Sequence, residues 1–318
     1  MREMPEDMRE NPQPGEDLFS YLLELARVRS ALSGGLVAGG AWALAFPATP
    51  LVKFWGIRRG SAWIDVGTGK PLAARAGDVF LFNAPGPHLL ASDLAVPPLP
   101  LDALGPGRAG AILHHGEDGG AGADFFMIGG KVALDEGSAP LLFGGLPPVL
   151  RLAADSPRAA PVHWILERLV AERDAGLPGG AAASAQLAQL MLIEILRAHL
   201  AEPGALGSGS FKALADARLA PALRLMHGDP GRAWRLPELA AACAMSRAAF
   251  SAHFGKVAGS SPLHYLTGLR MRLALRRLRQ SDVGIARLAE EYGYGSESAF
   301  SHAFKRVLGR PPKAFRQA

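Results

Sequence analysis

SESAFSHAFKRVLGRPP, residues 296–312, is the stretch that decides how the C-terminal third of this 318-residue chain folds. Ser296 is a favourable N-cap and therefore predicts the start of a helix. Phe300 and Phe304 stand four residues apart, so they lie on one face of that helix, which we expect to be buried. The opposite face must point outward, and the basic residues Lys305 and Arg306 lie near the end of the helix.

A similar stretch, SRAAFSAHFGKVAGSSP, occupies residues 246–262, fifty residues earlier. Eight of the seventeen aligned positions are identical: Ser246/Ser296, Ala249/Ala299, Phe250/Phe300, Ser251/Ser301, Phe254/Phe304, Val257/Val307, Gly259/Gly309 and Pro262/Pro312. Both stretches follow a short apolar segment and a turn, which is the pattern of a helix-turn-helix. Two copies are too few for a solenoid, so we predict a duplicated unit, at about 236–257 and about 285–308.

The outward faces of the two capped helices predict how these units bind DNA. Side chains on such a face reach base edges in the major groove, whereas basic residues nearby hold the phosphate backbone. The predicted base-reading residues are Arg247, Ala248, Ser251, Ala252, Glu297, Ser298, Ser301 and His302. The predicted phosphate contacts are Lys256, Lys305, Arg306, Arg310 and Lys313.

The segment between the units, PLHYLTGLRMRLALRRLRQS, reads as one continuous helix that starts at Pro262. Its nineteen or twenty residues would span roughly 28–30 Å at about 1.5 Å per residue. That length approaches the roughly 34 Å between successive major-groove faces on one side of DNA. We therefore expect both units to dock on one side of a single duplex.

The charge of the chain is unevenly distributed. Residues 211–318 contain 18 Lys and Arg against 7 Asp and Glu, a net charge of +11. The remainder has 16 basic and 22 acidic residues, a net charge of −6. A basic domain joined to an acidic one suggests that only the C-terminal domain meets a polyanion.

The N-terminal part has a different composition. Residues 1–16 are charged and Pro-rich and predict a disordered tail. Residues 17–152 contain short apolar runs such as LVKFWGI and GDVFLF, separated by turn residues, which is typical of an all-β sandwich or barrel. The uncharged run 30–52 is long enough to cross a membrane, but its Gly and Pro residues favour strands and turns. A flexible loop is predicted at 116–124.

Helical periodicity follows at 153–202, and 203–210 predicts a flexible Gly/Ser linker to the domain at 211–318. The apolar stripe of the helical segment is wide, so two uses remain open, a dimer interface and packing on the chain's own β domain. The chain has a single cysteine, Cys243, which excludes an intrachain disulfide and fits a cytoplasmic location. No signal-peptide pattern is present at the N-terminus.

With these motifs in view, residues 218–316 resemble the DNA-binding domain of the AraC/XylS-type bacterial transcription regulators. The resemblance implies promoter binding, contact with RNA polymerase, more often activation than repression, and a separate sensing or dimerising domain. This sequence departs from the family pattern at Ala244, where a glycine is common. Ala248 and Ala252 cannot donate hydrogen bonds from their side chains, so the second unit, with Glu297 and His302, is expected to discriminate bases more strongly.

The N-terminal domain resembles, less specifically, the cupin-like β-barrel of one group of these regulators; RAGDVFLFNAPGPHLL is one stretch that carries the likeness. A cupin metal site takes several histidines and a glutamate, and here only His88 stands where such a ligand is expected. One ligand does not hold a metal well, so we predict no metal, no cofactor and no catalytic residue. His114 and His115, adjacent at a predicted strand end, would point to opposite faces.

Two uses of the aromatic residues of the barrel remain open: a pocket for a small, fairly apolar effector, with Trp55, Trp63, Phe82 and His88 as its candidate residues, and ordinary core packing. The leading interpretation is thus a multidomain, homodimeric DNA-binding regulator, with an all-β cupin-like domain and an all-α domain of two helix-turn-helix units. One alternative is a cupin enzyme fused to a DNA-binding domain. Another is an architectural protein that binds DNA without sequence preference.

Overall fold

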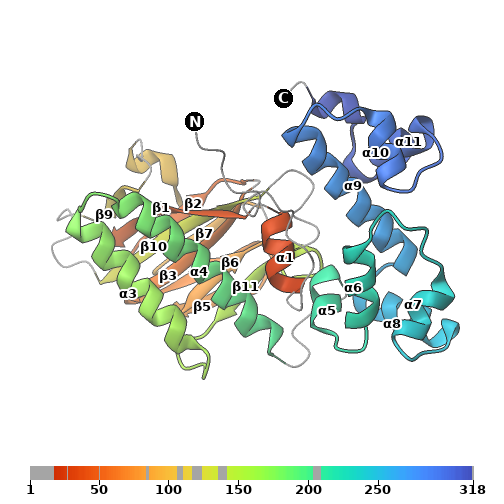
Figure 1. Ribbon diagram of the computed structural model, residues 1–318. Helices are drawn as coiled ribbons and strands as arrows, with labels where there is room; N and C mark the ends of the chain where they lie inside the picture. Colours follow the sequence, from red (N-terminus) through yellow and green to blue (C-terminus); the bar gives the residue numbers. More distant parts are fainter. Residues whose placement is uncertain are drawn as a thin grey trace. The chain divides into compact units, whose positions relative to one another are not determined.

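The computed structural model describes residues 18–26, 28–49, 51–83, 86–105, 110–116, 124–134, 142–202 and 209–316 (Figure 1). Contacts between Cα atoms divide the chain into two compact units. The β unit comprises Val28–Ala133 and Leu146–Ala205, and the helical unit comprises Met1–Arg27, Leu134–Gly145 and Leu206–Ala318. The tail predicted at 1–16 lies outside the described residues, as do most of the predicted linker at 203–210 and most of the predicted loop at 116–124.

The β unit is built from two sheets. The strands are β1 (Arg29–Ala38), β2 (Ala43–Phe46), β3 (Val52–Arg59), β4 (Ser61–Asp65), β5 (Leu72–Arg75), β6 (Val79–Phe82), β7 (His88–Ala91), β8 (Leu99–Pro100), β9 (Ile112–His115), β10 (Phe125–Ala133) and β11 (Val149–Leu152). A six-stranded sheet has the order β11-β6-β3-β10-β1-β9, and a five-stranded sheet has the order β5-β4-β7-β2-β8. A short 3-10 helix, η2 (Leu101–Leu104), follows β8. The predicted cupin-like β domain is confirmed.

The core of the β unit lies between its sheets, because alternate residues of each strand point inward. On β3, for example, Trp55 and Ile57 belong to this core. Gly56, between them, faces helix α3 (Ala159–Ala175), where a Cβ atom would clash with the Leu166 side chain. The largest fully buried side chains of this core are Trp42, Phe80 and Phe125.

Two helices cover the six-stranded sheet (Figure 1). Helix α4 (Gly180–Leu200) packs on β1 and β11 and runs beside α3. Their inward stripe is buried and consists of Val162, Ile165, Leu166, Leu169, Ala188, Met191, Leu192, Ile195 and Leu196. Of the two uses predicted for this segment, the structure shows packing on the chain's own sheet. Trp164 nevertheless stays 56% exposed on α3.

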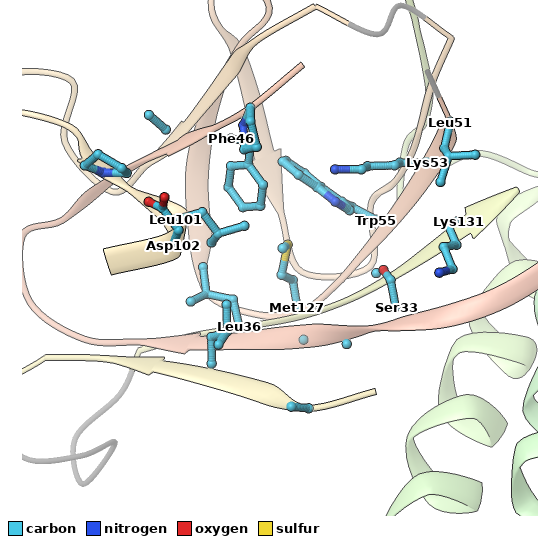
Figure 2. Close-up of a pocket in the computed structure, with 18 of the residues that line it drawn as sticks. Ser33, Leu36, Phe46, Leu51, Lys53, Trp55, Leu101, Asp102, Met127 and Lys131 are labelled. Carbon is cyan, nitrogen blue, oxygen red and sulfur yellow. The ribbon is translucent and has the colours of Figure 1, made fainter. Parts of the chain in front are cut away.

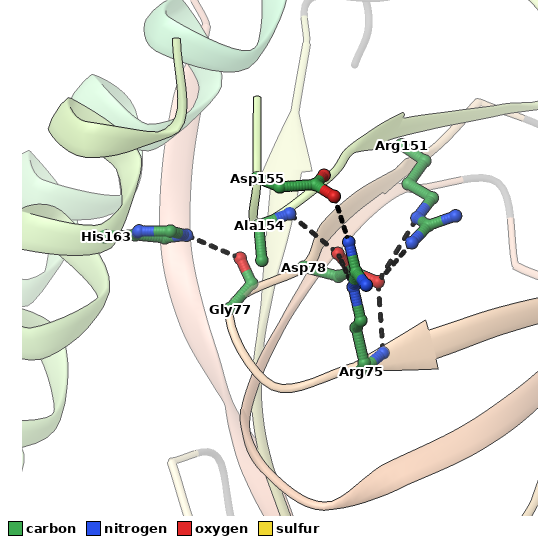
Figure 3. A network of polar contacts seen from close by, with 7 residues as sticks. All are labelled: Arg75, Gly77, Asp78, Arg151, Ala154, Asp155 and His163. Atoms are coloured by element: carbon green, nitrogen blue, oxygen red, sulfur yellow. Dashed lines mark hydrogen bonds and ion pairs between the residues drawn. The ribbon is translucent and has the colours of Figure 1, made fainter. Parts of the chain in front are cut away.

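A buried carboxylate ties the edge of this sheet to the chain that leads into α3 (Figure 3). Asp78, fully buried, accepts hydrogen bonds from the Arg151 guanidinium at 2.8 Å and from the Ala154 backbone N–H at 2.8 Å. His163 of α3 donates to the carbonyl oxygen of the adjacent Gly77 at 2.8 Å. Such a hydrogen-bonded charge fixes a corner of the fold, because breaking one partner would leave a buried ion unpaired.

The helical unit contains α1 (Leu18–Leu25), α5 (Ser210–Ala215), α6 (Ala220–Gly228), α7 (Leu236–Ala242), α8 (Arg247–Ala258), α9 (Pro262–Gln280), α10 (Ile285–Glu291), α11 (Glu297–Leu308) and the 3-10 helix η3 (Pro312–Phe315). The prediction of one long helix between two helix-turn-helix units is confirmed. Helix α9 has 19 residues and thus spans about 28 Å. Among the described residues, no helix combines the length and the hydropathy needed to cross a membrane.

Helix α1 lies in a different unit from the one that the sequence indicated. Residues 17–152 were expected to form one domain, yet α1 packs with the helical unit. Phe19 makes an edge-on contact with Phe211 at 5.6 Å between ring centroids, and Tyr21 contacts His227 at 5.2 Å. The apolar face of α1, with Leu22 fully buried, explains this placement, because an isolated eight-residue helix is not stable without such packing.

Candidate nucleic-acid interface and effector cavity

The two capped helices, α8 and α11, have the same construction. Ser246 Oγ accepts a hydrogen bond from the Ala249 backbone N–H at 3.2 Å, and Ser296 Oγ accepts one from Ala299 at 3.2 Å. The phenylalanine pairs Phe250/Phe254 and Phe300/Phe304 are buried, with centroids 5.7 Å apart in each helix. Cap and aromatic anchor together fix which face of each helix points away from the core.

Eleven of the thirteen predicted DNA-contacting residues lie on α8 or α11, and the other two, Arg310 and Lys313, follow α11. Among the base-reading candidates, Ser251 and Ser301 are half-buried and the others are exposed: Arg247, Ala248, Ala252, Glu297, Ser298 and His302. The five predicted phosphate contacts are all exposed: Lys256, Lys305, Arg306, Arg310 and Lys313. The guanidinium of Arg310 also lies over the Phe315 ring, 4.4 Å from its centroid.

The turns of the two units differ in one respect. Ala244 turns the first unit with φ of 52°, and it is the one non-glycine residue with positive φ among the described residues. Gly293 occupies the same place in the second unit with φ of 75°. After each, a backbone N–H returns to the preceding helix, from Met245 to Ala240 at 3.0 Å and from Tyr294 to Ala289 at 2.7 Å. Alanine pays a steric cost at this backbone conformation that glycine avoids.

The two helix-turn-helix units, both within the helical unit, also contact each other directly. A Cβ atom at Gly293 would clash with the carbonyl oxygen of Gly231, which lies in the loop before α7. Arg270 of α9 reinforces this junction by donating to the carbonyl oxygens of Pro230 and, at 2.7 Å, of Arg232. The orientation of α8 relative to α11 is therefore fixed by more than a shared helix. The sequence did not single out Arg270, because nothing in a helical pattern tells a structural arginine from a DNA-binding one.

A histidine lies buried beneath the first unit. His227 of α6 is 2.7 Å from the hydroxyl of Tyr265 through its Nε2 atom. Burial lowers the pKa of His227 to about 3, so the ring is neutral near pH 7. Burial also raises the pKa of the Tyr265 hydroxyl. This pair is part of the support for α8, and Phe254 of that helix packs edge-on against Tyr265.

In the β unit, a cavity of about 940 Å³ opens between the sheets (Figure 2). Its lining is mostly apolar and includes Leu36, Phe46, Leu51, Trp55, Leu101, Leu113 and Met127. The charged residues of the lining are Lys53, Lys131 and Asp102. A volume of this size is within the range of small-molecule sites, which is roughly 300–1,000 Å³.

The four predicted effector-pocket residues do not all lie in this cavity. Trp55 lines it, and His88 and Phe82 are buried directly behind Trp55. Trp63 does not line this cavity, because its side chain is 41% exposed and lines a separate hollow beside Arg75 and Arg151. On β4 the buried residues are Ala62 and Ile64, so strand alternation directs Trp63 to the outside.

His88 is held in an aromatic stack. Its ring lies between those of Phe46 and Phe82, each at 5.2 Å, and its Nδ1 is 3.1 Å from the carbonyl oxygen of Gly86. Burial lowers the pKa of His88. Among the described residues, no group of three or more His, Cys, Asp or Glu side chains is placed to hold a metal ion. His114 and His115 do end a strand, β9, where His114 is exposed and His115 half-buried.

Sequence reasoning missed both lysines of the cavity. Lys53 is two residues before Trp55 on β3, so strand alternation was a usable signal for it. No local sequence pattern predicts that Lys131 lines the cavity, because only the pairing of β10 with β3 brings it next to Lys53.

The chain matches two family models, a cupin domain over residues 17–201 and a helix-turn-helix domain over residues 239–318. It is 38% identical over 306 residues to an AraC-like transcription regulator of Streptomyces lividans, covering 95% of this chain and 98% of that one. A similar relative from Streptomyces antibioticus is 39% identical over 306 residues, with the same two shares covered. The transcriptional activator RclR of Escherichia coli is 26% identical over 306 residues, covering 95% of this chain and 97% of that one.

Among solved structures, the DNA-binding domain of AdpA in complex with a target DNA is 31% identical. It covers 32% of this chain and 92% of that one, with a TM-score of 0.31. Three observations point to the same family: relatives that cover 95% of the chain, the two family models, and the two capped helices of the helical unit. The chain belongs to the AraC-like transcription regulators, with an N-terminal cupin domain and a C-terminal helix-turn-helix DNA-binding domain.

Proposed function

We propose that this regulator binds a promoter operator by inserting α8 and α11 into successive major grooves on one side of the duplex. The observation that carries this proposal is the matched pair of capped helices whose outward faces are exposed while their phenylalanines are buried. Helix α9 and the contact between the units keep the two faces at one separation, which suits two half-elements about one helical turn apart. The net charge of +11 over residues 211–318 supplies the attraction to phosphate.

Within this proposal, Glu297, Ser298, Ser301 and His302 read bases more strongly than Arg247, Ala248, Ser251 and Ala252 do. The basic residues Lys256, Lys305, Arg306, Arg310 and Lys313 contact phosphates. The protein works in the cytoplasm as an activator that contacts RNA polymerase, and an effector in the β-unit cavity controls it. RclR, which is named an activator, supports the sign of regulation. We assign no catalytic role to the chain.

The test is selection of bound duplexes from a random pool by the full-length protein, followed by a titration of affinity against salt. Enrichment of a motif with two half-elements about one helical turn apart is the expected result. A salt dependence without enrichment would overturn sequence-specific binding and favour an architectural role. Transcription from a template with the selected operator, with and without the protein, then gives the sign of regulation.

A homodimer is the proposed assembly, with the outer face of α3 and α4 as its interface. Trp164 of α3 supports this choice because its side chain is 56% exposed and would be buried by such a contact. Trp164→Glu should shift the protein from dimer to monomer in light scattering. An unchanged mass would remove this face from consideration.

A further inference from the structure

Two lysines face each other across neighbouring strands of the β unit. In the antiparallel pairing of β3 with β10, Lys53 is directly opposite Lys131. Both side chains line the cavity, and Figure 2 shows them on one side of it, with Asp102 across from them. Like charges directly opposite in a sheet are destabilising, so a function of the two lysines would explain why they are placed together.

Neither lysine has an acidic partner within the described part of the chain. Arg58 of the same strand, by contrast, is 3.7 Å from Glu167, and Arg151 pairs with Asp78 at 2.8 Å. Lys53 is half-buried, and this burial lowers its pKa. A partly dehydrated ammonium group is a favourable place for an anion, because an anion offsets the desolvation; Lys131, exposed at the same end of the cavity, supplies a second cation.

The surface next to this cationic end is apolar. Trp55 follows Lys53 on the same face of β3, and Met127 lies on the same face of β10 as Lys131. Gly129, between Met127 and Lys131 on that face, keeps the wall open, since a Cβ there would lie 3.1 Å from the Trp55 ring. A ligand for this cavity therefore needs both a negative head and an apolar body.

We propose that the cavity binds an amphipathic organic anion whose carboxylate or sulfonate lies between the amino groups of Lys53 and Lys131. The apolar body packs on Trp55, Phe46 and Leu36, and the negative head lies at the lysine end of the cavity, away from Asp102. This inference rests on the proposed role of the β unit as an effector domain and names the chemical class of the effector.

The probes are 1-anilinonaphthalene-8-sulfonate and its neutral counterpart N-phenyl-1-naphthylamine, which lacks the sulfonate. Both are titrated by fluorescence into the full-length protein and three variants: Lys53→Met, Lys131→Gln and the control Lys70→Gln. Lys70 is exposed and does not line the cavity. Each cavity variant should weaken sulfonate binding about tenfold and leave the neutral probe within about twofold. Added salt should weaken only the sulfonate.

Equal changes for both probes, or a Lys70→Gln effect as large as that of the cavity variants, would contradict the proposal that Lys53 and Lys131 hold the anion. A cooperative thermal transition for each variant shows that the probe reports the folded cavity and not exposed core. Operator affinity, measured with and without the sulfonate, separates this inference from the proposed function. Lysine-dependent probe binding without any effect on operator affinity would keep the ligand class and remove its regulatory role.

Discussion

The first and second helix-turn-helix units share a framework but differ on the surfaces that they present. Both have a serine N-cap with a 3.2 Å bond, two buried phenylalanines and a C-terminal glycine with positive φ, Gly259 or Gly309. Their outward faces have little in common, since Ala252 in the first corresponds to His302 in the second. The core and the caps need the same residue types wherever this fold is built. Folding does not constrain the side chains of the outward face in this way, so they can differ between the units.

The turns show a second difference, which has a structural cause. Gly293 lies against the backbone of Gly231 and cannot carry a side chain there. Ala244 occupies the matching place in the first unit and accepts a left-handed conformation. Glycine is thus required in the second unit by a contact between the units, and not by the turn itself.

Gly293→Ala should produce the largest loss. A methyl group there meets the Gly231 carbonyl oxygen in addition to an unfavourable φ, so we expect the free energy of unfolding to fall by about 3 kcal/mol. Gly309→Ala is the matched control, because Gly309 also has a positive φ, of 80°, and a Cβ there meets no atom within 4 Å. Thermal unfolding followed by circular dichroism measures both. Equal effects would mean that the turn, and not the contact between the units, requires glycine.

Acid should weaken the first unit through His227. The folded pKa is about 3, and the ordinary value is 6.5. Below pH 6.5 the unfolded chain binds a proton that the folded chain does not, so stability present above pH 6.5 is lost as the pH falls toward 3. Between pH 6.5 and pH 5 this loss is about 2 kcal/mol.

Urea unfolding at the two pH values tests this expectation. His227→Gln should remove most of the difference, whereas His302→Gln, at an exposed position, should leave it unchanged. If His227→Gln unfolded with the same pH dependence as the parent protein, another group would be responsible.

Exchanging one matched pair of residues tests whether the second unit reads bases more strongly. His302→Ala should weaken binding to the selected operator about tenfold, or about 1.4 kcal/mol, and relax the preference at one base pair. Ala252→His should instead create a new preference in the half-element of the first unit. Competition among operator variants measures both, and an unchanged ranking with His302→Ala would contradict the assignment.

Ala244→Gly should give the smallest effect, and with the opposite sign. Glycine relieves about 1 kcal/mol of steric cost at this φ, and its greater freedom in the unfolded chain returns about 0.5 kcal/mol. A net gain of about 0.5 kcal/mol is therefore expected in the same thermal assay. A loss of stability would show that the Ala244 methyl group makes packing contacts worth more than the strain.

The duplicated helix-turn-helix framework was predictable from the sequence, because the serine caps and the phenylalanine spacing are local and repeat at a fixed offset of fifty residues. The presence of a β domain was predictable as well, since short apolar runs between turn residues are local signals. Strand alternation, applied to β4, would have placed Trp63 outside. These features depend on residues near each other in the chain.

Features that depend on contacts between distant segments became apparent only in the folded chain. Helix α1 joins the helical unit because its apolar face finds Phe211 and His227, about two hundred residues away in sequence. The strand register that sets Lys53 against Lys131 joins segments 78 residues apart, and no local pattern contains it. The close approach of Gly293 to Gly231 has the same origin. Long-range pairing is chosen by packing of the whole unit, so residues whose role comes from such pairing are found only in the folded chain.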